Sequence, residues 1–152
     1  MTTPLSVAVD DLPGAEGTAF GPSEWRVITQ EEVDDFARLS GDMNPIHIDP
    51  DFAATTSYGT TIVHGLFTLS LVVPLMKEIL EVTGVGLGIN YGSNRLRFPA
   101  PVPVGARIRV SGVLKSVTEV TGGYQVEVPV TFEVEGGEKP VLVTELVLRY
   151  YR

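Results

Sequence analysis

The sequence predicts a single α+β domain in which an antiparallel sheet wraps around one buried helix. Residues 124–134 alternate between apolar and polar side chains, a pattern typical of a strand with one buried face. Ahead of them, residues 65–81 are apolar around most of the helical circumference, which is typical of a helix enclosed by the rest of the protein. Because long strands follow such a helix, we expect the sheet to fold around it.

The length, composition and net charge of the chain limit the classes of protein to which it can belong. The chain of 152 residues, 43% of them hydrophobic, is long enough for one domain with a substantial core. It contains no cysteine, which excludes disulfides and thiolate nucleophiles and suits a cytoplasmic location. The longest uncharged apolar run, residues 66–76, is much shorter than the roughly 20 residues of a membrane span. A net charge of −8 disfavours nucleic acids and anionic membranes as partners.

The first 23 residues predict a loose N-terminal arm ahead of one domain at residues 24–152. Proline, glycine and scattered acidic residues occur in this segment without helical or strand periodicity. It also lacks the basic and apolar regions of a signal peptide. We therefore expect a cytoplasmic protein with a partly ordered arm.

Two helices are expected between the arm and the apolar helix. Thr29 and Glu32 have the spacing of a capping box, and Gly41 is a typical residue after the last turn, so a helix is predicted between them. A second, short helix is predicted to begin at residues 49–50, where aspartate can cap the first turn and proline can occupy it. Within the later apolar helix, Pro74 removes one backbone hydrogen bond and should bend the axis.

Four long strands should follow the apolar helix. Besides residues 124–134, the segments rich in β-branched and aromatic side chains are residues 88–98, 107–120 and 141–151. A half-open sheet of this kind leaves an unpaired edge and uncovered apolar surface. Pairing with a second copy closes both, so we expect a homodimer.

The only two histidines, His47 and His64, lie close together in the sequence, and Asp42 is near them. Pro45 prevents one continuous helix from Asp42 to His47 and favours an extended or turning backbone. Such a turn can direct a carboxylate and an imidazole into one pocket, where they could hold and activate a water molecule. The alternative is structural: Asp42 caps the following turn and His47 packs in the core.

Residues 36–71, FARLSGDMNPIHIDPDFAATTSYGTTIVHGLFTLSL, resemble the hydratase motif of the MaoC-like (R)-specific enoyl-CoA hydratases. The likeness continues at residues 97–108, RFPAPVPVGARI, and extends over most of residues 25–150. Residues 90–105 look most similar to the branch that contains nodulation protein N-like members. The resemblance implies a hotdog fold, in which an antiparallel sheet wraps around a central helix.

The resemblance also implies roles for individual residues. Asp42 and His47 match the catalytic pair of the family, and Asn44 matches an asparagine that we assign to orienting the pair or the water. Gly65 matches the glycine whose backbone N–H binds the thioester carbonyl oxygen, which suits a helix N-terminus. A serine that lines the site in some family members falls on Val73 here, which leaves substrate preference open.

The implied reaction is (R)-specific hydration of trans-2-enoyl-CoA to (3R)-3-hydroxyacyl-CoA, or the reverse dehydration. A (3R)-hydroxyacyl-ACP dehydratase and a non-catalytic module that binds an acyl ligand or a partner subunit are the alternatives. No cofactor is expected, because CoA is part of the substrate. Arg95 and Arg97 are candidates for contacts with the CoA phosphates, although alternating arginines also occur on the wet face of strands. No metal-ligand spacing such as H-E-x-x-H is present, so we expect no metal site.

Overall fold

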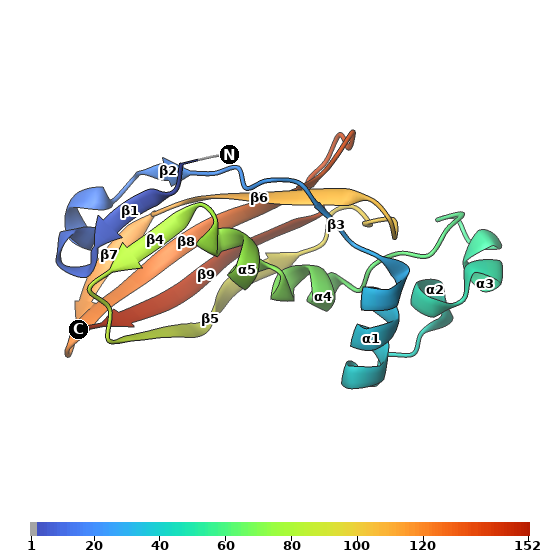
Figure 1. Cartoon of the computed structure of the whole chain (residues 1–152), viewed down its shortest axis with the longest axis horizontal. Coiled ribbons are helices and arrows are strands. Elements are labelled where there is room, and N and C mark those ends of the chain that lie inside the picture. The colour runs from blue at the N-terminus through green and yellow to red at the C-terminus, as the bar shows by residue number, and fades with distance from the viewer. Residues whose placement is uncertain (1–2) are drawn as a thin grey trace.

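The computed structural model describes residues 3–152 as an antiparallel sheet that curves around a pair of short helices (Figure 1). The sheet has seven strands, and its main path runs in the order β2, β6, β8, β9, β5, with β3 beside β6 and β7 beside β8. The strands are β2 (Ala19–Phe20), β3 (Arg26–Val27), β5 (Leu87–Arg97), β6 (Arg107–Val113), β7 (Ser116–Val120), β8 (Gly123–Val134) and β9 (Leu142–Tyr151). The predicted fold class is confirmed.

The four long strands occupy the predicted segments with one interruption. The segment expected as one strand at residues 107–120 is split into β6 and β7 at residues 114–115. There the N–H of Leu114 donates to Thr18 and the N–H of Lys115 donates to Glu127, so the backbone changes partners. In β8 every second side chain from Val126 to Phe132 is buried, as the alternation predicts.

The apolar helix is broken into α4 (Gly65–Ser70) and α5 (Val72–Lys77). Pro74 supplies the reason, because it has no N–H to donate to the carbonyl of Ser70 and its ring crowds that carbonyl. The helical segment also ends earlier than the expected residue 81. Residues Leu80–Thr83 form strand β4 instead.

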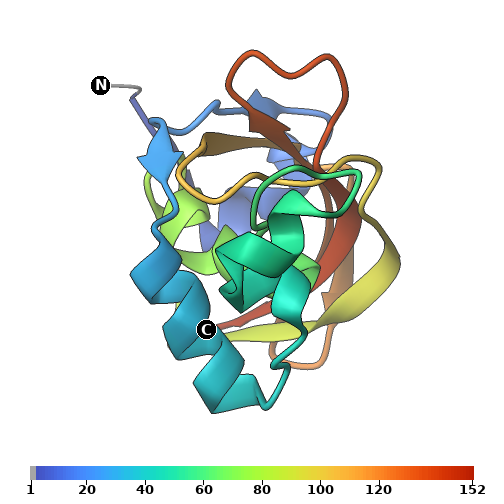
Figure 2. The same cartoon turned by 90° about the vertical axis from the view of Figure 1, so that its right-hand side faces the viewer.

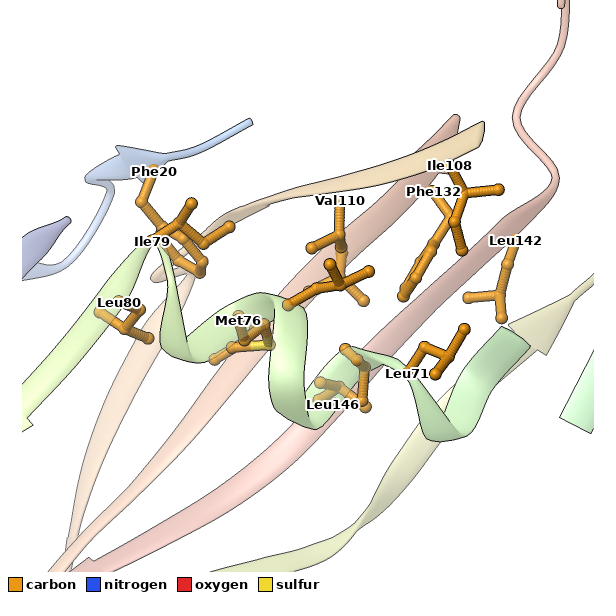
Figure 3. Close-up of a cluster of buried hydrophobic side chains, with 14 of the residues drawn as sticks. Phe20, Leu71, Met76, Ile79, Leu80, Ile108, Val110, Phe132, Leu142 and Leu146 are labelled. Carbon is orange, nitrogen blue, oxygen red and sulfur yellow. The ribbon is translucent and has the colours of Figure 1, made fainter. Parts of the chain in front are cut away.

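One face of this broken helix forms the centre of the core, while the other is exposed. Leu71 and Met76 point toward the sheet and lie near Leu146 of β9 (Figure 3). On the opposite face, Leu66 and Val73 are 61% and 49% exposed. The expectation that the helix is enclosed on most sides is therefore wrong for the single chain.

The N-terminal segment is packed into the domain, which corrects the expectation of a loose arm. Strand β1 (Leu5–Ala8) pairs in parallel with β4, and a 3-10 helix, η1 (Val9–Ala15), follows it. Leu12 of η1 has no exposed surface, and Phe20 of β2 is also buried in the main core. The segment is irregular because its elements are short, but its apolar side chains complete the core.

Helices α1, α2 and α3 lie together beyond one end of the sheet (Figures 1 and 2). Helix α1 (Gln30–Ser40) begins with the predicted capping box of Thr29 and Glu32, and Gly41 ends it at a left-handed φ of 81°. Helix α3 (Pro50–Ala54) is capped by Asp49, as expected. Helix α2 (Pro45–Ile48) was not expected.

Proline at the first position of α2 explains this difference. Pro45 prevents a helix from running through from residue 42, but its fixed φ suits the start of a new one. The side-chain oxygen of Asn44 accepts the N–H of Ile46 and caps this turn. No helix among residues 3–152 has the length and hydropathy needed to span a membrane.

Truncating Leu12 measures how much the N-terminal segment contributes to folding. Because Leu12 is completely buried, Leu12→Ala should lower the free energy of unfolding by about 2–5 kcal/mol. The matched control is Leu39→Ala, at a leucine that is 88% exposed, which should change it by less than about 0.5 kcal/mol. Urea unfolding followed by circular dichroism gives both values. Equal, small effects would mean that the segment is an unattached arm.

Candidate functional site

Asp42, His47, His64 and Gly65 line one cavity of about 380 Å³. The cavity lies where helix α2, the start of α4 and residues 98–102 meet. The structure therefore brings together the predicted pair, the second histidine and the predicted backbone donor, although they come from different elements.

His47 is buried and has a defined tautomer. Its Nδ1 lies 2.7 Å from the backbone oxygen of Ile62, which can only accept, so Nδ1 carries the proton and Nε2 has a free lone pair. Burial lowers the pKa of His47 because a charged ring loses hydration, and the neighbouring His64 lowers it further. The Ile62 carbonyl and Asp42 act in the opposite direction but do not reverse the shift. His47 is thus favoured as a neutral ring that can accept a proton.

Asp42 is exposed and lies in the loop between α1 and α2. One carboxylate oxygen is 3.4 Å from the N–H of Asn44, a long contact that leaves the rest of the carboxylate available. One side-chain atom each from Asp42, His47 and His64 lies within 4.8 Å of the others. Two such groups at this separation can share one bridging water molecule.

Asn44 stands beside the cavity but does not line it. Its side-chain oxygen caps α2, and its backbone N–H faces Asp42. The contacts of Asn44 therefore fix the turn that carries the aspartate and the histidine. Direct orientation of a water molecule by its side chain stays a prediction.

Gly65 is the first residue of α4, and its N–H finds no acceptor within residues 3–152. The ring of Phe98 covers the glycine: a Cβ at position 65 would lie 2.8 Å from the ring. Glycine thus allows the Phe98 ring to lie directly over the backbone at the start of α4. Phe98 and Thr68 also line the cavity and were not recognised as site residues, although Phe98 lies within the family-like stretch at residues 97–108.

The stacking of the two histidines argues against a shared metal ion, although a carboxylate and two imidazoles can bind one. Their ring centres are 3.8 Å apart with an angle of 27° between the planes. Imidazole lone pairs lie in the ring plane, so nearly parallel stacked rings direct them along separate planes. The arrangement suits proton transfer better than coordination.

Arg95 and Arg97 are exposed on β5 and line a separate hollow of about 790 Å³ rather than the cavity. Neither forms an ion pair within residues 3–152, whereas Arg107 and Arg109 each pair with a neighbouring glutamate. Arg97 directly precedes Phe98 of the cavity wall. Contact of these two arginines with CoA phosphates stays a prediction.

A family model and individual relatives both match most of the length of this chain. The family described as MaoC like domain matches residues 11–135. The 3-hydroxyacyl-thioester dehydratase Z of Mycobacterium tuberculosis is 49% identical over 144 residues, which cover 94% of this chain and 95% of that protein. Nodulation protein N of Rhizobium leguminosarum is 36% identical over 153 residues, with 94% and 89% covered. Identity is thus higher to the dehydratase than to this nodulation protein.

Among solved structures, the (R)-hydratase from A. caviae involved in PHA biosynthesis superposes with a TM-score of 0.73 at 30% identity. The match covers 88% of this chain and 94% of that chain. The likeness confirms the hotdog fold, and the sequence match spans both segments on which the resemblance was based. The chain belongs to the MaoC-like family of hydratases and dehydratases.

Proposed function

We propose that this protein adds water to trans-2-enoyl thioesters to give (3R)-3-hydroxyacyl thioesters, or catalyses the reverse dehydration. The observation that carries the proposal is the placement of Asp42 and His47 around one cavity with the unpaired N–H of Gly65. A hydration of this kind needs a site for water, two groups that move protons and a donor for the thioester oxygen. These residues offer all of them.

In the proposed reaction the water oxygen bonds to the β-carbon, and the C=C double bond is lost. One member of the Asp42–His47 pair takes a proton from the water, and the other delivers a proton to the α-carbon. The free Nε2 lone pair of His47 supports a role in accepting protons. The pair therefore starts with one proton: the protonated member gives it to the α-carbon, the other takes one from the attacking water, and the pair again holds one proton at the end. The pH dependence of turnover assigns which member starts protonated.

The thioester oxygen is proposed to accept the N–H of Gly65 as negative charge develops on it. A donor that already points at this position stabilises the enolate without reorganisation. The start of a helix adds favourable electrostatics, and α4 continues into α5 with only the break at Leu71. The ring of Phe98 lies over the same backbone and would keep water away from the carbonyl.

CoA is the proposed carrier, and the exposed Arg95 and Arg97 are its proposed phosphate contacts. A 3-hydroxyacyl thioester on acyl carrier protein is the second candidate substrate. The name of the mycobacterial relative, a 3-hydroxyacyl-thioester dehydratase, is compatible with either carrier. A non-catalytic binding module would need neither the carboxylate nor the imidazole.

We further propose that two copies pair through β5 and the exposed face of the broken helix. Strand β5 is an edge of the sheet, and almost all of its residues are exposed. Leu66 and Val73 add a neighbouring apolar surface. An edge this long pairs readily with another strand, and a second copy would cover both features.

Loss of the conjugated absorbance of crotonyl-CoA, and of a longer enoyl-CoA, tests the reaction. Asp42→Asn and His47→Gln should each reduce turnover by about 10²-fold or more, because both groups move protons in the transition state. The double variant should lose much less than the product of the two factors, since both act on one water. Circular dichroism serves as the folding control. Activity near that of the wild type in either folded single variant would assign that residue to packing or capping.

The Gly65 donor is tested by proline, which removes the N–H and keeps a helical φ. His64 precedes it with a ψ of 133°, a conformation that proline tolerates. Because any Cβ at position 65 meets Phe98, Gly65→Pro and Gly65→Ala are compared in a Phe98→Ala background. The proline variant should turn over about 10²–10³ times more slowly than the alanine variant. Equal rates would remove the donor from the mechanism.

The proposed dimer predicts a mass of twice 16.4 kDa by light scattering at micromolar concentration. Val73→Arg places a charge in the proposed interface and should give a monomer. Val27→Arg is the matched control, since Val27 is 47% exposed and Val73 is 49% exposed, but Val27 lies on β3 and away from β5. A monomeric wild type, or dissociation of both variants alike, would contradict this interface.

A further inference from the structure

His64 is almost completely buried beside the cavity, with 2% of its surface exposed, and the reaction proposed above gives it no task. It precedes Gly65 and forms the N-cap of α4, but its side chain makes no capping hydrogen bond. The His64 side chain therefore neither caps α4 nor carries a proton in the proposed reaction, and its burial beside the cavity needs another explanation.

The side chain of His64 contacts both members of the catalytic pair. Its Nε2 lies 3.0 Å from the backbone oxygen of Asp42. Its ring stacks on that of His47 with 3.8 Å between the centres. A third contact, with 4.9 Å between ring centres, joins it to Phe36 of α1.

These contacts determine the protonation of the ring. The backbone oxygen of Asp42 can only accept, so Nε2 of His64 carries the proton. The other nitrogen, Nδ1, is buried and has no hydrogen-bond partner within residues 3–152. A proton on Nδ1 would be a buried donor without an acceptor, and its charge would lie against His47. Of the two neutral tautomers, these contacts favour the one with the proton on Nε2.

The loop that carries Asp42 joins α1 to α2, and His64 is the side chain that binds the Asp42 carbonyl. Residues 41–44 form no helix or strand. The backbone N–H of Asp42 donates to Ser40 over a long 3.2 Å, and its carbonyl is held by His64. Asn44 and Gly41 also fix the backbone of this loop, but the His64 side chain contacts both Asp42 and His47. His64 therefore couples the position of the carboxylate to that of the imidazole.

We propose that His64 is a positioning residue, which holds Asp42 through its backbone and His47 through ring stacking. It sets the separation of the two proton-moving groups without contacting substrate. This inference rests on the proposed hydration and assigns a role to a residue outside the catalytic pair.

The electrostatics of His47 provide a readout that packing alone would not change. The titratable groups that face His47 are Asp42 and His64, and Tyr58 lines the same cavity. Burial lowers the pKa of His47, and repulsion from a charge on the neighbouring His64 lowers it further. Replacing His64 by a group that cannot be charged removes the second effect. The pKa of His47 should then rise, and the limb of the pH–rate profile that it controls should move to higher pH.

The first experiment uses the wild-type protein without substrate. With only two histidines in the chain, ring ¹H–¹⁵N NMR spectra contain two sets of signals, which His47→Gln assigns. The expected tautomers are Nε2–H for His64 and Nδ1–H for His47. A His64 ring that carries its proton on Nδ1 at neutral pH would overturn the proposal.

The second experiment separates the two contacts of His64. His64→Phe keeps a ring for stacking and loses the N–H, whereas His64→Gln keeps an N–H donor and loses the ring. Each should lower kcat about 10- to 100-fold with KM within about threefold, because the reacting groups are misplaced while substrate binding persists. In both, the NMR titration midpoint of His47 should move to higher pH. Leu39→Ala, at a residue of α1 that is 88% exposed, should change neither quantity.

Two outcomes of these experiments test the proposed role of His64 separately from the proposed hydration. If both His64 variants are folded and retain the kcat and the His47 titration of the wild type, His64 is a packing residue and the proposal is wrong. If the wild type hydrates no enoyl thioester while the tautomers and the titration shifts are as expected, the proposed function fails and the contacts of His64 with the pair stand.

Discussion

The candidate site depends on how the buried segment of residues 61–64 is held. The carbonyl of Ile62 accepts the Nδ1–H of His47, and the N–H of Ile62 donates to the carbonyl of Ile46. Ile62 therefore holds both the backbone of α2 and its histidine side chain. One residue on, the N–H of Val63 donates to Val102 and attaches the same segment to the loop after β5. The chain then enters α4 at Gly65. Three elements that are distant in sequence therefore converge because one short stretch of backbone bonds to each of them, and its side chains are buried.

The sequence predicted best what depends on local chemistry. The capping box at Thr29, the end of α1 at Gly41 and the cap at Asp49 follow from side chains that satisfy the adjacent backbone. The alternation in β8 predicts its buried face for an equally local reason. The burial of a helix face cannot be predicted in this local way, because it depends on which other parts of the protein pack against the helix. The composition of residues 65–81 predicts an enclosed helix, yet a single chain leaves one face exposed.

The features that the sequence did not predict are those set by distant contacts. The N-terminal segment has no periodicity because β1 and β2 are only four and two residues long, and its order comes from β4 and β6. The family resemblance brought Asp42, His47 and Gly65 together, and the structure places all three at one cavity. It did not indicate that Phe98 covers Gly65 or that His64 lies against His47. Such contacts are made between side chains far apart in sequence, and no local pattern encodes them.

The break at Leu71 has a consequence for how this protein can change over evolutionary time. Helix α5 supplies Val72, Leu75 and Met76 to the core, whereas α4 supplies Gly65 and Thr68 to the cavity. The break does not separate these two tasks completely, because Phe67 and Leu69 of α4 also pack against the core. A substitution in α4 that reshapes the cavity therefore also acts on core packing, so the shape of the cavity and the stability of the fold change together.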